Sequence, residues 1–218
     1  MSMGWMRMPG ETWPVVALSF LGMWLLMMAA MMLPSLAPTL WRYRRALAER
    51  SEARTAGLTA MVGTGYFSVW AVIGLAVFPV GAALTEAEMR LPALARATPL
   101  VVGFVVLLAG ALQFTAWKAH HLACSRELPA RRGSSQSDAI TAWQYGLRLG
   151  LHCSYCCTGM TAILLVAGFM ELRTMTLVTA AVTLERLAPA GPRVARAIGS
   201  VAVVTGTLLI ARAAGVGG

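Results

Sequence analysis

The chain has 218 residues, of which 58% are hydrophobic and only 12% are charged, and its formal net charge at pH 7 is +9. Soluble domains average about 25% charged residues, so the composition excludes an ordinary soluble protein. The arginines lie in short segments between apolar blocks rather than in a basic patch interleaved with aromatic residues. We therefore expect no nucleic-acid partner and a lipid bilayer as the environment of the chain.

Long apolar blocks predict an all-α, polytopic membrane helical bundle, because about 20 apolar residues are needed for a helix to cross a bilayer. We predict one integral membrane domain over residues 1–218, with six spans at about 13–33, 57–84, 99–117, 145–169, 174–187 and 194–211. The fifth block is short and therefore marginal as a span. The first block exceeds the length of a signal peptide and has no small-residue cleavage site, so we expect it to be retained.

Prolines and polar segments predict where the spans end. Pro34 and Pro38 are expected to stop the first span, after which a basic connector follows. Pro79 is expected to kink the second span. Residues 118–138 form the longest polar segment and are predicted to be a loop.

The distribution of Lys and Arg predicts the orientation of the bundle. With six spans, twelve of these residues fall in the first, third and fifth connectors and five on the opposite side. The positive-inside rule then predicts a multi-pass protein of the inner (plasma) membrane with both termini outside and these three connectors in the cytoplasm. Should the fifth block not cross the membrane, the C-terminus changes side and the first four spans keep their orientation.

Residues 152–157 read His-Cys-Ser-Tyr-Cys-Cys and contain three of the four cysteines. Thiolate and thioether ligands select Cu(I), zinc or iron–sulfur chemistry, and imidazole suits copper, zinc and iron. One buried cysteine would be an ordinary packing residue, but three within five residues beside a histidine in a span favour metal ligands. At about 100° per residue, one face of the predicted helix carries the whole set: His152, Cys153, Cys156, Cys157 and Met160.

Two other groups of soft ligands are predicted at a similar depth near the same membrane face. His121 and Cys124 have i,i+3 spacing just beyond the third span. The first span contributes four methionines, which taken alone would be packing residues: Met27, Met28, Met31 and Met32. We therefore predict one shared metal site, with copper as the best match to mixed Cys, Met and His ligands and zinc or iron as alternatives.

Several polar residues next to the spans are not expected to belong to this site. Gln113 and Lys118 are interpreted as interface residues, because lysines near helix ends extend toward the headgroups. Glu171 and Glu185 are interpreted as loop or interface residues. No acid/base pair or nucleophile constellation is visible, and no catalytic residue is assigned.

At these residues the chain resembles a large bacterial family described as predicted metal-binding integral membrane proteins of unknown function. The matching features follow in order over most of the chain: Trp24-x-x-Met27-x-x-Ala30-Met31-Met32-x-Pro34, Gly65-Tyr66 with Trp70, Gln113 to Lys118 with His121 and Cys124, and Gly146 to Cys157 with Gly168, Met170 and Glu185-Arg186. This chain departs from the family pattern at His121, where a cysteine is usual, and at Thr158, where an aromatic residue is usual. The resemblance implies metal binding and, through the association of the family with copper-related proteins, copper. It implies no particular reaction.

The leading hypothesis is a copper-binding membrane protein that acts in metal handling or cofactor assembly with a membrane or periplasmic protein partner. One alternative is a copper-dependent oxidoreductase acting on a small lipophilic substrate or quinol, since imidazole supports both Cu(II) and Cu(I). Another is a structural subunit whose cysteines and methionines are packing residues only. A homo-oligomer is compatible with each of these. Copper transport is the least favoured role, because the soft ligands lie mainly at one depth.

Overall fold

The computed structural model of the chain describes residues 12–47, 51–126, 138–168 and 171–215, without the side chains of residues 92–95 and 122–126. Within these ranges the chain forms helices and no strands, so the predicted all-α class is confirmed. The helices are α1 (Trp13–Ala46), α2 (Glu52–Arg90), α3 (Pro92–Leu112), α4 (Ala116–Arg126), α5 (Ala139–Ala167), α6 (Leu172–Leu187) and α7 (Gly191–Ala213).

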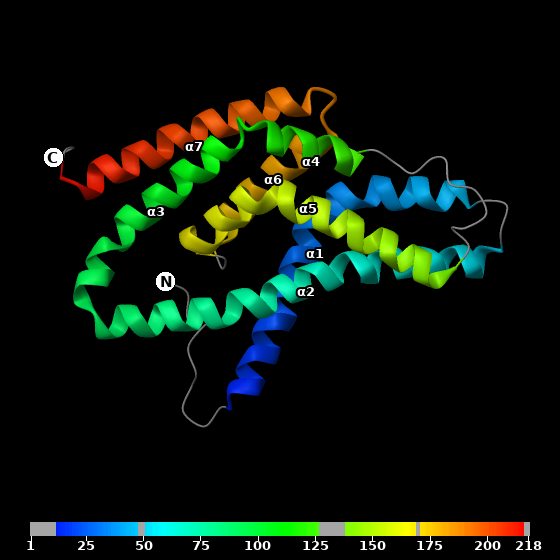
Figure 1. Ribbon diagram of the computed structural model, residues 1–218, viewed down its shortest axis with the longest axis horizontal. Coiled ribbons are helices and arrows are strands. Elements are labelled where there is room, and N and C mark those ends of the chain that lie inside the picture. Colours follow the sequence, from blue (N-terminus) through cyan, green and yellow to red (C-terminus); the bar gives the residue numbers. More distant parts are fainter. Residues whose placement is uncertain (1–11, 48–50, 127–137, 169–170, 216–218) are drawn as a thin grey trace.

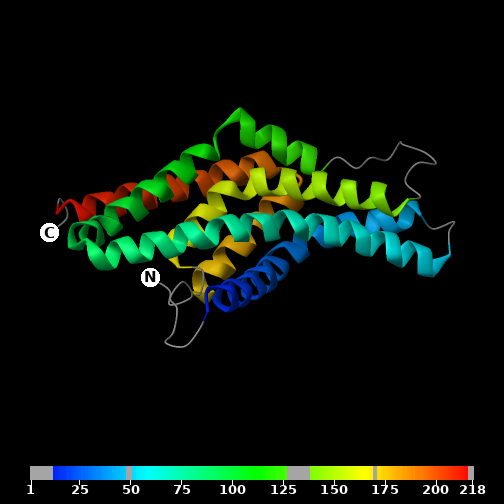
Figure 2. The same ribbon diagram turned by 60° about the horizontal axis from the view of Figure 1, so that its bottom comes forward.

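Two pairs of helices organise the bundle. α2 and α5 lie side by side and run in the same direction, while α3 and α7 form an antiparallel pair (Figures 1 and 2). α1 packs against α2 and α6, and the short helix α4 packs against α5. The core between α1, α2, α5 and α6 is therefore enclosed by helices that are distant in sequence.

Glycines allow α2 and α5 to approach closely. A Cβ atom added at Gly65 would meet the carbonyl oxygen of Trp143, and one added at Gly146 would meet the carbonyl oxygen of Val62. Small residues at such positions let two helix backbones come into contact, as in other membrane helix pairs. This contact fixes the face of α5 that carries the cysteines.

Four helices, α1, α2, α5 and α7, are long and apolar enough to cross a membrane, so the prediction of about six spans was wrong. α3 has 21 residues, but only its part Arg96–Leu112 has described side chains, and that part is shorter than the ~20 residues that a span requires. α6 has 16 residues, which gives a helix of about 24 Å against a hydrocarbon core of about 30 Å. The predicted third and fifth spans are therefore not among the four candidate spans in the described part of the chain.

Two predicted boundaries also differ from the structure. α1 continues through Pro34 and Pro38 to Ala46 and changes direction along its length (Figure 1). A proline inside a helix removes one hydrogen bond and bends the axis, but packing on both sides can maintain the helix. The third apolar block ends at Leu112, and α4 then occupies the first part of the predicted polar loop.

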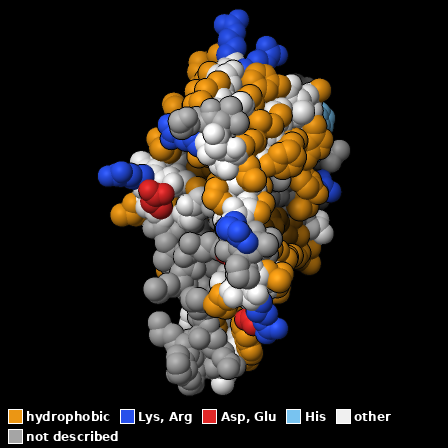
Figure 3. Space-filling view, turned by 90° about the vertical axis from the view of Figure 1, so that its left-hand side faces the viewer, with side chains coloured by type: hydrophobic (Ala, Val, Ile, Leu, Met, Phe, Trp, Pro, Cys, Tyr) orange, Lys and Arg blue, Asp and Glu red, His pale blue; other side chains and the backbone are white. Residues whose placement is uncertain are grey.

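Hydrophobic side chains cover much of the described surface (Figure 3). Large apolar residues on the candidate spans are exposed, for example Leu26 at 75% and Val72 at 66%. Monomeric soluble proteins rarely expose large continuous apolar areas. This surface is the kind that helices in contact with lipid present.

The close contact of α2 and α5 predicts different outcomes for two neighbouring glycines. Gly65→Ala should lower the thermal stability of the detergent-solubilised protein, because overpacking typically costs about 1–3 kcal/mol. Gly63→Ala is the matched control, since a Cβ atom there meets nothing within 4 Å and Ala is the better helix former. Unfolding followed by tryptophan fluorescence checks this. Equal midpoints for the two variants would contradict it.

Candidate metal centre

Sulfur-containing side chains from α1 and α5 meet in one buried cluster. Cys153, Cys156 and Cys157 are at most 1% exposed, and each is a free cysteine. The same core includes Trp24, Tyr66 and five methionines: Met27, Met28, Met31, Met32 and Met160. The structure thus brings together the methionines of α1 and the cysteines of α5 that the sequence singled out as candidate ligands.

The shortest sulfur contacts centre on Cys153. Its Sγ lies 3.9 Å from Sγ of Cys157 and 3.9 Å from Sδ of Met32. Two sulfur ligands that share one metal through bonds of about 2.3 Å lie about 3.8–4.0 Å apart in tetrahedral or trigonal geometry. In the part of the chain that the structure describes, no three His, Cys, Asp or Glu side chains form such a group. The third sulfur in contact here is the thioether of Met32.

Two hydrogen-bond donors surround the Cys153 sulfur. Arg186 Nη1 lies 3.1 Å from Cys153 Sγ and also donates to Ser35 Oγ at 3.1 Å, while the Tyr66 hydroxyl donates to Cys153 Sγ at 3.0 Å. Arg186 is only 6% exposed, so its charge acts on the sulfur with little screening by solvent. A guanidinium and a hydroxyl directed at one sulfur favour the thiolate, which is the form that binds metals.

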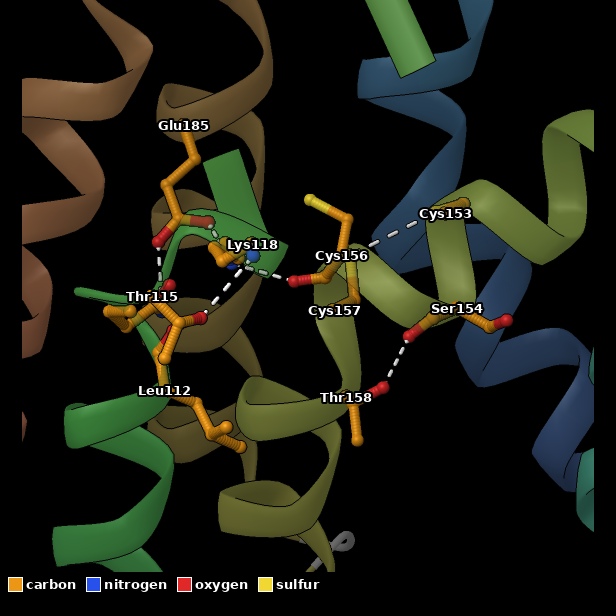
Figure 4. A network of polar contacts seen from close by, with 10 residues as sticks. Leu112, Thr115, Lys118, Cys153, Ser154, Cys156, Cys157, Thr158 and Glu185 are labelled. Atoms are coloured by element: carbon orange, nitrogen blue, oxygen red, sulfur yellow. Dashed lines mark hydrogen bonds and ion pairs between the residues drawn. The ribbon is translucent and has the colours of Figure 1, made fainter. Parts of the chain in front are cut away.

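A second buried polar group connects α3, α4, α5 and α6. Lys118 Nζ donates to Glu185 Oε2 at 2.8 Å and to the carbonyl oxygen of Cys156 at 2.6 Å. Gln113 Nε2 donates to Glu185 Oε1 at 3.0 Å. Figure 4 shows Lys118 between Glu185 and Cys156. Each of the three polar side chains is at most 5% exposed.

The interpretation of Gln113, Lys118 and Glu185 as interface or loop residues was therefore wrong. The chain leaves α3 at Leu112 and begins α4 at Ala116, and this break directs Lys118 into the bundle. Glu185 lies near the end of α6, which packs on α1, α5 and α7. The sequence signal was a charge within an otherwise apolar segment, which in membrane proteins usually faces the interior of the bundle.

Residue-by-residue reasoning also missed Arg186, Tyr66 and Ser35 as neighbours of the cysteines. Tyr66 and Arg186 were included in the family pattern, but spacing along the chain does not relate either residue to Cys153. Tyr66 precedes Cys153 by 87 positions and Arg186 follows it by 33. Only the packing of α2 and α6 on α5 brings them to the sulfur.

The histidines occupy a different position. Nδ1 of His121 on α4 lies 3.3 Å from Nδ1 of His152 on α5, and both side chains are half-buried. Within the described ranges, no hydrogen bond of the sulfur cluster involves either histidine. Cys124 follows in α4, and its side chain is outside the described part of the structure. The ligands predicted to share one site thus form two groups among the described residues: the sulfur cluster and the histidine pair.

The environment of His121 favours its neutral form. The pKa of His121 is lowered from its ordinary value, first because burial disfavours the charged imidazolium. Positive charge on His152 or His120 would lower it further by repulsion. A neutral imidazole has the lone pair that a metal ion requires.

The fold and the sulfur cluster define an all-helical protein with apolar helices around a buried set of soft-metal donors. The chain belongs to the PpoB2 family, described as copper chaperone, whose model matches residues 21–209. This range includes both the sulfur cluster and the histidine pair. The searches of curated proteins and of solved structures found no match.

The buried ion pair predicts a large effect for a single substitution. Lys118→Met removes the ammonium that donates to Glu185 and to the Cys156 carbonyl, and breaking a buried pair from one side typically costs about 3–5 kcal/mol. Adding Glu185→Gln should recover part of this loss, since the buried carboxylate charge is then also removed. Thermal unfolding in detergent measures both effects.

Arg90→Met is the matched control for Lys118→Met. Arg90 pairs with Glu86, but the two side chains are 75% and 54% exposed. Exposed pairs contribute little to stability, so this variant should unfold near the wild-type temperature. Similar losses for the Lys118 and Arg90 variants would show that the Lys118–Glu185 pair is not the stabilising element described above.

Proposed function

We propose that this chain is an integral membrane copper chaperone that holds Cu(I) between α1 and α5 through Cys153, Cys157 and Met32. The observation that carries the proposal is the contact of Cys153 Sγ with two further sulfurs at 3.9 Å each. The description of the family as copper chaperone supports copper as the cargo. Two thiolates and a thioether are soft ligands of the kind that select Cu(I).

The charges around the cluster favour a monovalent metal. Cu(I) with two thiolates has a net charge of −1, which the guanidinium of Arg186 balances. The Lys118–Glu185 pair adds no net charge. A divalent zinc ion in the same set would leave one positive charge in a buried, apolar environment, where uncompensated charge is unfavourable. The donor set and its surroundings thus support Cu(I) over Zn(II).

The other members of the cluster have supporting roles in this proposal. Arg186 and Tyr66 are positioning residues, because they hold the Cys153 sulfur in its thiolate form and in one orientation. Cys156 and four methionines of the same core are further candidate ligands on the two helices: Met27, Met28, Met31 and Met160. Spare sulfur donors beside a bound ion suit a carrier, since ligand exchange lets it release its cargo.

In this proposal the copper leaves the chain for a copper-dependent enzyme or another carrier in the membrane or periplasm. The four apolar helices and the exposed apolar surface support a location in the bacterial inner membrane. The oxidoreductase alternative required imidazole in the same site to support Cu(II). The described donors around Cys153 are sulfur, so holding Cu(I) without redox cycling is the function we favour.

Substitution of the ligands should weaken Cu(I) binding selectively. Cys153→Ser should lower Cu(I) affinity by about 100-fold or more, because loss of a ligand exceeds the 10–100-fold typical of supporting residues. Met32→Leu conserves volume and should have a smaller effect of about 10-fold. Anaerobic competition with a Cu(I)-specific chelator measures both affinities.

Met61→Leu is the control for Met32→Leu, since Met61 is 43% exposed and lies outside the cluster. It should bind Cu(I) like the wild-type protein. Affinities that are equal among wild type, Cys153→Ser and Met32→Leu would overturn the proposed site.

The charge argument predicts a change of metal preference on substitution of Arg186. Arg186→Gln should lower Cu(I) affinity by about 10–100-fold, since the negative charge of the Cu(I) site is then uncompensated. Zn(II) affinity should fall less or rise, which reduces the preference for Cu(I). Arg193→Gln, the same change at an exposed position of α7, should alter neither affinity. Parallel losses for the two metals would contradict the role of the charge.

A further inference from the structure

The histidine pair between α4 and α5 has a nitrogen–nitrogen distance that matches two ligands of one metal ion. Nδ1 of His121 and Nδ1 of His152 are 3.3 Å apart, although the residues are 31 positions apart in sequence. Two nitrogen ligands of one metal, with bonds of about 2.0–2.1 Å, lie about 3.3–3.4 Å apart at a tetrahedral angle. The separation of the two nitrogens therefore suits a shared metal ion, which would replace the hydrogen bond that one imidazole N–H now donates to the other.

Aromatic rings hold the His121 imidazole in place. The rings of Trp117 and Tyr155 lie 4.8 and 5.1 Å from it, centroid to centroid, and Trp117 belongs to the same helix as His121. Tyr155 follows His152 by three residues on α5, so the same two helices supply the ligands and their support. Fixed ring orientations reduce the entropy lost when a metal binds.

Access distinguishes this pair from the sulfur cluster. Cys153 and Cys157 are at most 1% exposed, whereas Trp117 and Tyr155, which pack on His121, are 44% and 45% exposed. Two protein ligands leave coordination positions open, as in sites that exchange water or substrate. A metal at this pair is therefore within reach of donors on another molecule, which a metal at the buried sulfurs is not.

We propose that His121 and His152 form a second metal site, separate from the sulfur cluster, that binds one copper ion at the surface between α4 and α5. The site itself follows from the geometry of the pair. Its role as the position where copper is exchanged with other carriers rests on the chaperone function proposed above. Exchange there is a ligand substitution in which copper–nitrogen bonds break as bonds to the carrier's donors form, and the oxidation state of copper does not change.

Cu(II) ions are the probe for this site, because bound nitrogen ligands can be counted by electron paramagnetic resonance. The experiment uses the full chain without a polyhistidine tag and with all four cysteines changed to serine, so that no thiol binds or reduces the metal. We expect one Cu(II) per chain with a two-nitrogen signature. Adding His121→Ala and His152→Ala should abolish it.

His120→Ala is the matched control, because His120 is exposed and adjoins His121 on α4. It should retain the bound Cu(II) and its two-nitrogen signature. A signature that survives the double His121→Ala, His152→Ala change, or that is lost equally with His120→Ala, would overturn the proposed site.

A second measurement covers the case in which the serine variants do not fold. The chain with all its cysteines should bind two Cu(I) ions, and His121→Ala with His152→Ala should reduce this to one. Equal copper contents would overturn the histidine site and leave the sulfur site intact. Conversely, a histidine-dependent Cu(II) signal in a protein whose cysteines bind no Cu(I) would support this site and overturn the proposed chaperone centre.

Discussion

Arg186 and Cys153 depend on each other in this structure. The guanidinium lies 3.1 Å from a sulfur that is fully buried, and neither a charged arginine nor a thiolate is stable alone in an apolar core. Ser35 and Tyr66 complete the hydrogen bonds of the two groups. The contact also joins α1, α2, α5 and α6 at one point, so the position of the candidate metal ligands and the packing of four helices have the same cause.

The buried polar residues explain why two helices too short to cross a membrane belong to the bundle. α6 provides both Glu185 and Arg186, and α4 provides Lys118, which reaches the carbonyl oxygen of Cys156. Lys118 and Glu185 compensate each other where α4 meets α6, and Arg186 meets the Cys153 sulfur only where α6 packs against α5. The ion pair and the guanidinium contact together hold α5 from two sides at the turn that carries the cysteines.

A metal carrier must both hold its ion tightly and release it to another protein, and each proposed site meets one of these requirements. A buried set of sulfur ligands protects Cu(I) from solvent and binds it tightly, but its burial hinders direct transfer to another protein. A half-buried imidazole pair with open coordination positions binds less selectively and is accessible. His152 and Cys153 are consecutive residues of α5, so one turn of one helix contributes to both sites.

Much of the fold and part of the candidate site could be predicted from the sequence. Uncharged apolar blocks require helices in a membrane, because backbone groups must be satisfied within each segment. The number of spans could not be predicted in this way, since the length of the apolar block at 174–187 did not show that α6 has only 16 residues. The continuation of α1 through Pro34 and Pro38 could not be predicted either, because it depends on packing around the bend.

By itself, the sequence determined which residues share a face of a helix, because the helical period is a local property. For this reason one face of α5 carries Cys153, Cys156, Cys157 and Met160. The methionines of α1 share a face of that helix for the same reason. The neighbours of each face were decided only by the tertiary structure. Helix contacts between distant segments bring Arg186 and Tyr66 to Cys153, and they bring His152 to His121 rather than to the sulfurs.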